Sequence, residues 1–214
     1  MTAASWWRRD GASCVCGLCP RACRIPEGGT GVCGARGGTK WGLDASSYGM
    51  VASLCVDPIE KKPLFHYRPG QECLSVGGLG CNMRCLHCQN HALSIPDHRV
   101  RATYVPPDEL VGICRREGLD TIAFTYNEPA IWLEYVRDTA RESGPAGIAM
   151  ITNGMVSEEP LREACGFVDA MNIDVKGFTE GFYRRICGAG LDDVLRTCEI
   201  AFQNGIHTEL TYSQ

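Results

Sequence analysis

From residue 73 onward the sequence alternates short apolar runs with stretches of helical period, and this alternation constrains the fold more than any other feature. It is typical of parallel sheets whose strands are joined by right-handed helical crossovers. We therefore expect an α/β fold with the sheet closed or partly closed as a barrel. The predicted strands are CLSVGGLG, DTIAFTY, AGIAMITNG, FVDAMNIDVKG and IHTELTY. The predicted helices are PPDELVGICRREG, PAIWLEYVRDTARESG, SEEPLREAC and LDDVLRTCEIAFQNG.

Polar residues or cysteines follow four of the five predicted strands at the points where the strands end. In parallel α/β folds the carboxyl ends of the strands meet at one edge, where reactive groups gather. The four segments therefore predict one functional site. They are the cysteine triplet after the first strand, TYNEP after the second, TNG after the third and DVKG after the fourth.

Cysteine is unusually frequent, at 14 of 214 residues. Disulfide scaffolds reach such a density, but they are short, secreted and loop-rich. This chain is longer, and its first residues offer no apolar core of signal-peptide length. Thiolate ligation of metal is therefore the preferred explanation for the clustered cysteines. The scattered ones lie in helical patterns and are interpreted as small buried hydrophobes; they are Cys114, Cys165, Cys187 and Cys198.

The overall charge and apolar content exclude several classes of partner. A net charge of −4 argues against a broad nucleic-acid-binding surface. The longest apolar runs are too short to span a bilayer. We expect a soluble cytoplasmic protein that has neither a nucleic-acid nor a membrane partner.

The triplet Cys81, Cys85 and Cys88 lies within eight residues, directly after a glycine-rich apolar run. Three such thiolates can hold three irons of a [4Fe–4S] cube and leave the fourth iron without a protein ligand. A catalytic metal needs an open position of this kind, whereas structural sites are closed. Zinc is the alternative, with His87 or His91 as its fourth ligand.

A second group of cysteines near the N-terminus has the short paired spacing of a closed tetrahedral metal site. The segment around it is rich in Cys, Gly and Pro and shows no sustained period, so it reads as a loop-built module that needs a metal. Zinc and an iron–sulfur cluster both fit, and Cys14 is an alternative ligand. The group consists of Cys16, Cys19, Cys23 and Cys33.

Several segments together resemble the radical S-adenosylmethionine (SAM) superfamily. CNMRCLHCQN is especially similar to the pyruvate formate-lyase-activating-enzyme branch. The wider match resembles the AmmeMemoRadiSam-system radical SAM enzymes and covers nearly the whole chain. Its segments are CGLCPRACRIPEGGTGVCG, VDPIEKKPLFHYRPG, FTYNEPAIW, TNG and NIDVKG.

The resemblance implies a partial parallel (β/α) barrel of the radical SAM type after a small Cys-rich metal-binding module. We expect the module over residues 1–50, a connector over 51–72 and the barrel over 73–214. Relatives of this kind continue beyond the fifth strand, so the barrel is expected to be truncated at its C-terminal end. Each boundary follows a change in composition.

The family also implies the chemistry. SAM chelates the open iron of a [4Fe–4S] cluster, and an electron cleaves it to give a 5′-deoxyadenosyl radical that abstracts hydrogen from a substrate. A protein or peptide substrate and an electron donor such as flavodoxin or ferredoxin are the implied partners. The alternatives are a non-catalytic iron–sulfur electron-transfer or metal-binding protein, and a zinc module that binds protein or nucleic acid.

The triplet cysteines are the implied cluster ligands. By the same resemblance His87 would contact the adenine of SAM, and Asn127 and Glu128 its methionine end. Glu128 could instead cap the helix that begins at Pro129.

Four residues at later strand ends match the family pattern near the SAM ribose and carboxylate. They are Thr152, Asn153, Asp174 and Lys176. Asp174 and Lys176 are two apart in a strand and share a face, so a surface salt bridge is the alternative reading. Activating enzymes often carry Asp before their TNG segment, and this chain has Ile151 there.

Overall fold

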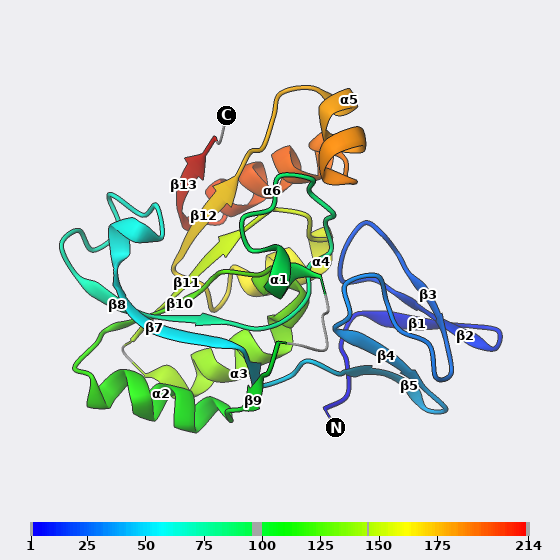
Figure 1. The fold of residues 1–214 in the computed structure, drawn as a ribbon, viewed down its shortest axis with the longest axis horizontal. Coiled ribbons are helices and arrows are strands. Elements are labelled where there is room, and N and C mark those ends of the chain that lie inside the picture. Colours follow the sequence, from blue (N-terminus) through cyan, green and yellow to red (C-terminus); the bar gives the residue numbers. More distant parts are fainter. Residues whose placement is uncertain (1, 96–99, 145, 213–214) are drawn as a thin grey trace.

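The computed structural model describes residues 2–95, 100–144 and 146–212. Its largest element is a six-stranded sheet in the order β13-β12-β11-β10-β8-β7 (Figure 1). The five strands from β13 to β8 run parallel, and β7 is antiparallel to β8. The predicted α/β fold and its five parallel strands are confirmed. The bounds are β7 (Ser53–Pro58), β8 (Glu72–Gly77), β10 (Thr121–Phe124), β11 (Gly147–Thr152), β12 (Ala170–Asp174) and β13 (His207–Thr211).

The helices that follow the parallel strands pack on one face of this sheet, where the larger apolar side chains point. Pro107 and Pro129 occupy first helical positions, where a missing N–H costs nothing. The longer helices are α2 (Pro107–Arg116), α3 (Leu133–Ser143), α4 (Glu158–Ala164) and α6 (Leu191–Gln203). The short ones are η1 (Ile59–Lys61), α1 (His91–Ser94), η2 (Pro129–Trp132), α5 (Glu180–Phe182) and the π-helical turn η3 (Tyr183–Cys187).

The other face of the sheet is covered by the chain between β7 and β8. Asn172 Nδ2 in β12 donates to Pro63 O in this segment (2.9 Å). Small side chains on the strands leave room for it, so two side chains of the segment pack directly on the sheet. The buried cluster on this face consists of Cys73, Ala123, Ala149 and Ala170 from the strands and Ile59 and Leu64 from the segment.

Strand β7 is a departure from the sequence-based interpretation of residues 51–72 as a connector. Prolines break the apolar pattern there, and Pro58 ends the strand. Proline is tolerated because β7 lies at the edge of the sheet, where one side of its backbone needs no partner. An edge strand of this kind has a weaker sequence signal than a central one.

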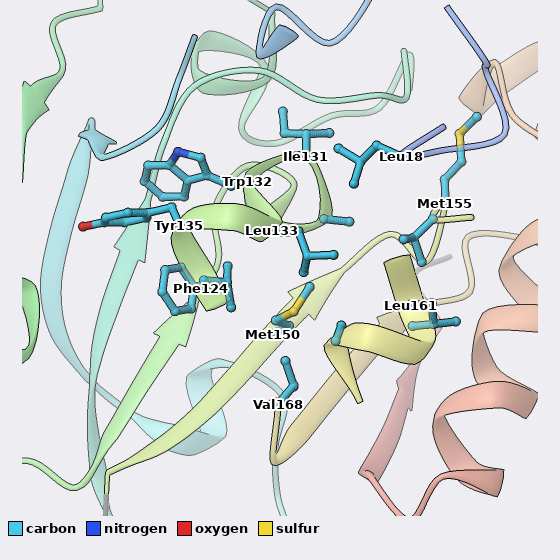
Figure 2. Close-up of a cluster of buried hydrophobic side chains, with 14 of the residues drawn as sticks. Leu18, Phe124, Ile131, Trp132, Leu133, Tyr135, Met150, Met155, Leu161 and Val168 are labelled. Atoms are coloured by element: carbon cyan, nitrogen blue, oxygen red, sulfur yellow. The ribbon is translucent and has the colours of Figure 1, made fainter. Parts of the chain in front are cut away.

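The N-terminal residues form small antiparallel sheets beside the main sheet (Figure 1). Leu18 from this region and Ile131 from η2 lie in one buried cluster with Met150 of β11, as Figure 2 shows. The hydrophobic core therefore runs continuously from the N-terminal sheets into the main sheet. The remaining strands are β1 (Trp7–Asp10), β2 (Ser13–Cys16), β3 (Arg24–Pro26), β4 (Arg36–Thr39), β5 (Gly42–Ala45), β6 (Met50–Val51) and β9 (Thr103–Tyr104).

A buried ion pair joins the two regions. Arg36 Nη1 and Nη2 contact Glu134 Oε1 and Oε2 of α3 at 2.6 and 2.8 Å. Both side chains are 1% exposed, so water does not screen the pair. Ser5 N also donates to Glu134 Oε1 (2.7 Å), which ties the first residues of the chain to the same carboxylate.

Candidate functional site

The loop with the cysteine triplet follows β8 and is held against η3. Arg84 N donates to Cys187 O (2.8 Å), and Leu86 N donates to Ile186 O (2.9 Å). These two bonds place the loop at the carboxyl edge of the sheet, where the loops after β10, β11 and β12 also lie. The prediction that the segments at the strand ends meet is supported by the contacts described below.

The thiol of Cys81 already faces two hydrogen-bond donors. Met83 N and Asn153 Nδ2 each lie 3.4 Å from Cys81 Sγ. Asn153 comes from the end of β11, so a predicted rim residue contacts the triplet directly. Donors of this kind stabilise iron-bound sulfur and tune a cluster's reduction potential.

Two of the triplet thiols have strongly raised pKa values. Burial raises the pKa of Cys81 to about 12, and the Glu128 carboxylate adds to this effect. The hydrogen bond between Cys85 and Cys187, followed by burial, raises the pKa of Cys85 well above its ordinary range. Both thiols are protonated at neutral pH in the metal-free protein, so metal binding must release protons.

Three free thiols on one loop fit a [4Fe–4S] cluster, because each thiolate binds a different iron. In the described parts of the chain, no group of three or more His, Cys, Asp or Glu side chains is arranged to hold a metal ion. A zinc ion requires four ligands that converge on one point. His87 and His91, the alternative fourth ligands of a zinc ion, are both exposed.

Glu128 is 1% exposed, and both of its carboxylate oxygens accept hydrogen bonds. Oε1 accepts from Thr152 Oγ1 (2.6 Å) and Ala130 N (2.8 Å), and Oε2 accepts from Asn153 N (2.8 Å). Burial raises its pKa, and these donors oppose that effect. The bond from Ala130 confirms the helix-capping alternative. The carboxylate also holds the end of β11 in place through Thr152 and Asn153, so it supports the backbone of the site.

Asn127 likewise holds the backbone of the site. Its Oδ1 accepts from Gly78 N (2.9 Å), and its Nδ2 donates to Gly80 O (3.1 Å). The amide therefore fixes the glycine run that leads into the triplet. The preceding Tyr126 has a φ of 71°, a conformation that non-glycine residues rarely adopt, and its hydroxyl donates to Asp57 Oδ2 (2.7 Å).

Thr152 is buried, and its hydroxyl accepts from Gly154 N (3.1 Å) while donating to Glu128. Its side chain thus stabilises the turn after β11. Thr152, Asn127 and Glu128 were predicted to contact SAM, and their side chains bond to other protein groups.

Asp174 and Lys176 form an ion pair at the end of β12. Lys176 Nζ lies 2.9 Å from Asp174 Oδ2, and the side chains are 17% and 31% exposed respectively. Burial lowers the pKa of Lys176, but Asp174, together with Cys85 and Glu128, outweighs burial, and the net shift is upward. The ammonium also acts on the Cys85 thiol, whose pKa it lowers. The pair is therefore near the triplet and partly exposed.

His87 lies on the surface between the second and third cysteines of the triplet. Its ring centroid is 6.3 Å from that of Phe182 in α5, with the planes tilted by 39°. His87 is exposed.

The second predicted cysteine group gathers around one cavity beside the triplet loop. Burial raises the pKa of Cys19 to about 11, and hydrogen bonds from Arg21 and Asn82 oppose this rise. The Arg36 guanidinium lowers the pKa of Cys16, although burial dominates and the net shift is upward. Cys14 lies in the hydrophobic core and is not one of the lining residues. The cysteines that line the cavity are Cys16, Cys19, Cys23 and Cys33.

Two residues with contacts at the site were missed in the sequence. Asn82 lies between the first two triplet cysteines and contacts the end of β11. Cys187, interpreted as a buried hydrophobe, accepts from Arg84 N of the triplet loop through its carbonyl oxygen (2.8 Å). Only the position of Asn82 inside the triplet offered a signal, because the partners of both residues are distant in sequence.

Comparison with known proteins identifies the family. Residues 75–213 match the radical SAM superfamily. The chain belongs to this superfamily. Membership in the radical SAM superfamily implies a [4Fe–4S] cluster, SAM binding and SAM-cleaving radical chemistry.

Two curated relatives were found. One is an uncharacterized protein of Methanocaldococcus jannaschii, 44% identical over 200 residues, which are 92% of this chain and 59% of that protein. The other is a GTP 3′,8-cyclase of Heliobacterium modesticaldum, 29% identical over 134 residues, or 59% of this chain and 41% of the cyclase. The radical SAM chain described here thus spans less than two thirds of either relative.

Two solved structures align with this chain at low sequence identity. TYW1 with a lysine-pyruvate adduct bound has a TM-score of 0.44 and 14% identity, covering 74% of this chain and 63% of TYW1. QueE from Escherichia coli has a TM-score of 0.41 and 11% identity, covering 76% and 93%. In the described part of this radical SAM protein, every helix is too short or too polar to cross a membrane.

Proposed function

We propose that this chain is an activating-enzyme-like radical SAM enzyme, closest in kind to the AmmeMemoRadiSam-system enzymes, and that it acts on a protein or peptide. The observation that carries the proposal is the contact of the triplet loop with the ends of β11 and η3. The segments around the cysteine triplet and around the N-terminal cysteines resemble that branch, and this resemblance supports the protein or peptide target.

Cys81, Cys85 and Cys88 would hold the [4Fe–4S] cluster. When bound, the cluster and SAM together supply the electron and the 5′-deoxyadenosyl group for hydrogen abstraction. The chain's own part is to orient and enclose these groups. Asn127 and Glu128 fix the loops around the triplet, and Asn153 donates toward Cys81.

Asp174, Lys176 and His87 are the groups we assign to SAM itself. Asp174 presents an acceptor and Lys176 a donor on one face of the strand end, which suits the hydroxyls and the carboxylate of SAM. His87 offers a ring surface for adenine. The electron donor is proposed to be flavodoxin or ferredoxin.

We further propose a metal centre, either zinc or an iron–sulfur cluster, at Cys16, Cys19, Cys23 and Cys33. Their shared cavity supports this assignment. The Arg36 guanidinium beside them would offset part of the negative charge that four thiolates carry.

Cluster ligation can be tested by electron paramagnetic resonance after anaerobic reconstitution. Replacing all three triplet cysteines with Ala is expected to abolish a SAM-responsive [4Fe–4S] signal and to leave metal at the N-terminal cysteines. Retention of the same iron content and spectrum would overturn the ligand assignment. A SAM-unresponsive cluster in the unaltered protein would favour the electron-transfer alternative.

The assignment of SAM contacts predicts separate effects on binding and on the cluster. Asp174→Ala and Lys176→Ala should each weaken SAM binding about tenfold, the loss of one charge-assisted hydrogen bond, with full iron content. Isothermal titration calorimetry measures the affinity. Arg184→Ala, which breaks an exposed ion pair with Glu180, is the matched control. Unchanged affinity in both variants would remove the pair from the site.

A further inference from the structure

Tyr126 has a backbone conformation that tyrosine rarely adopts. Its φ is 71°, and Asn127 N donates across it to Thr125 O (2.9 Å). Together these features define a γ-turn with positive φ, a form that is rare and strained for residues other than glycine. Such a conformation persists only when the surrounding structure holds it in place.

A buried ion pair anchors the phenol of Tyr126. Tyr126 Oη donates to Asp57 Oδ2 (2.7 Å), and Lys62 Nζ donates to the same oxygen (2.8 Å). Lys62 Nζ also lies 3.4 Å from the phenol oxygen and 4.5 Å from the ring centroid. The side chains of Asp57 and Lys62 are 6% and 3% exposed, so water competes little for these bonds. Because hydrogen bonds to a carboxylate are stronger than those between neutral groups, this anchor can offset the strain of the turn.

The strained turn presents Asn127 to the glycine run that leads into the triplet. Asn127 Oδ1 accepts from Gly78 N (2.9 Å), and its Nδ2 donates to Gly80 O (3.1 Å). A Cβ at Gly77 would lie 2.9 Å from Tyr126 Cδ2, so the run also packs directly against the turn. A change of φ at Tyr126 would therefore move the amide that fixes the start of the triplet loop.

We propose that Tyr126 is a positioning residue whose anchored phenol locks the γ-turn and thereby sets the geometry of the triplet loop for the cluster and SAM. Asp57 and Lys62 hold the phenol, and Asn127 transmits the geometry of the turn to the loop. The inference rests on the proposed function, since it takes the triplet as the place where the cluster and SAM bind. It requires no contact between the phenol and SAM.

The positioning role predicts an unusual order among substitutions. Tyr126→Phe removes the anchor and keeps the strain, so part of the population should leave the positive-φ turn. Tyr126→Gly removes the anchor and the strain together, because glycine adopts positive φ at no steric cost. The Phe variant should therefore disturb the triplet loop more than the Gly variant. A role in packing, or a direct contact of the ring with SAM, predicts the reverse order, because only the Gly variant loses the ring.

Amide hydrogen exchange measures the loop without any bound group. It is followed by mass spectrometry in a peptide spanning residues 77–81 of the full chain before reconstitution. In Tyr126→Phe, exchange should be about tenfold faster than in the unaltered protein, the population shift that strain of this kind produces, because Gly78 N loses its fixed acceptor. Exchange in Tyr126→Gly should stay within about threefold of the unaltered rate.

SAM affinity of the reconstituted full chain, measured by calorimetry, should follow the same order. It should be about tenfold lower in Tyr126→Phe, for the same reason. Tyr48→Phe is the matched control, since Tyr48 Oη also donates to a carboxylate, Asp138 Oδ2 (2.8 Å), while its backbone lies outside the positive-φ region. The control should leave both the exchange rate and the affinity unchanged.

Unchanged exchange in Tyr126→Phe, or exchange at least as fast in Tyr126→Gly, would overturn the positioning role. If Tyr126→Gly does not fold, Tyr126→Asn takes its place, because asparagine also tolerates positive φ. Loss of the fold in both would show that the ring itself is required and would overturn the role as well.

Failure of the positioning role and failure of the proposed function give different results. The predicted exchange order with equal SAM affinity in all variants would overturn the claim that the turn positions the loop for SAM. The predicted exchange order with a cluster that does not respond to SAM in the unaltered protein would overturn the proposed function and still support the positioning of the loop by Tyr126.

Discussion

At the scale of single residues, the site contains buried groups that bond to the backbone and other side chains, and partly exposed groups that bond to each other. Glu128 and Thr152 are buried and bonded to protein atoms. Asp174 and Lys176 are partly exposed and bonded to each other. Burial therefore divides the predicted SAM contacts into two classes that substitutions can distinguish.

Glu128→Gln should destabilise the metal-free protein. A glutamine amide offers one acceptor oxygen, whereas the carboxylate serves Thr152, Ala130 and Asn153. At least one buried donor is left unpaired, at a cost of about 1–3 kcal/mol. Urea unfolding of the protein without metal or SAM measures this. An unchanged unfolding free energy would mean that Glu128 does not support the fold.

At the scale of elements, strand β13 is bonded to the segment between β7 and β8, which covers the face of the sheet opposite the helices. Glu209 accepts from Phe65 N (2.8 Å) and His66 N (2.9 Å), and it contacts His207 Nε2 (2.8 Å). Burial alone raises the pKa of Glu209, but these partners outweigh it and lower the pKa from 4.5 to about 2.

A carboxylate with a depressed folded-state pKa stabilises the fold above its unfolded pKa, and this contribution is lost as the pH falls through the folded value. Glu209→Gln should therefore lower the unfolding free energy by about 1–2 kcal/mol at pH 7. The difference from the unaltered protein should shrink between pH 4.5 and about 2. Urea unfolding across this range measures it; a difference independent of pH would contradict the assigned ionisation.

Elements with a strong repeating pattern could be predicted from the sequence, and elements defined by distant partners could not. Strand β10 is buried at all four positions and reads clearly as TIAF. Edge strand β7 contains proline, and its sequence does not show a clear strand pattern. The triplet was recognisable because its three cysteines are close in sequence. Asn82 and Cys19 line one cavity although they are more than sixty residues apart, and this proximity leaves no local pattern in the sequence.

At the scale of the whole molecule, the N-terminal sheets and the main sheet are joined by the Arg36–Glu134 pair and by a shared core (Figure 2). The same arginine lines the cavity of the N-terminal cysteines. One guanidinium therefore joins the two regions and also lies beside the N-terminal thiols.

Glu134→Ala should cost about 3–5 kcal/mol, because it leaves the Arg36 charge buried without its partner. Denaturant unfolding measures the loss. Glu158→Ala, which breaks an exposed pair with Arg162, should cost less than about 1 kcal/mol and serves as the control. Equal costs for the two substitutions would show that the buried pair does not hold the regions together.

The central claim is that the triplet loop forms a working radical SAM centre. The most direct measurement is the formation of 5′-deoxyadenosine after anaerobic incubation of the reconstituted protein with dithionite and SAM, read by chromatography. The account predicts slow, uncoupled formation of 5′-deoxyadenosine by the unaltered protein, and none by the variant with Ala at Cys81, Cys85 and Cys88. Absence of the product from unaltered protein with a fully loaded cluster, or equal amounts from the variant, would contradict it.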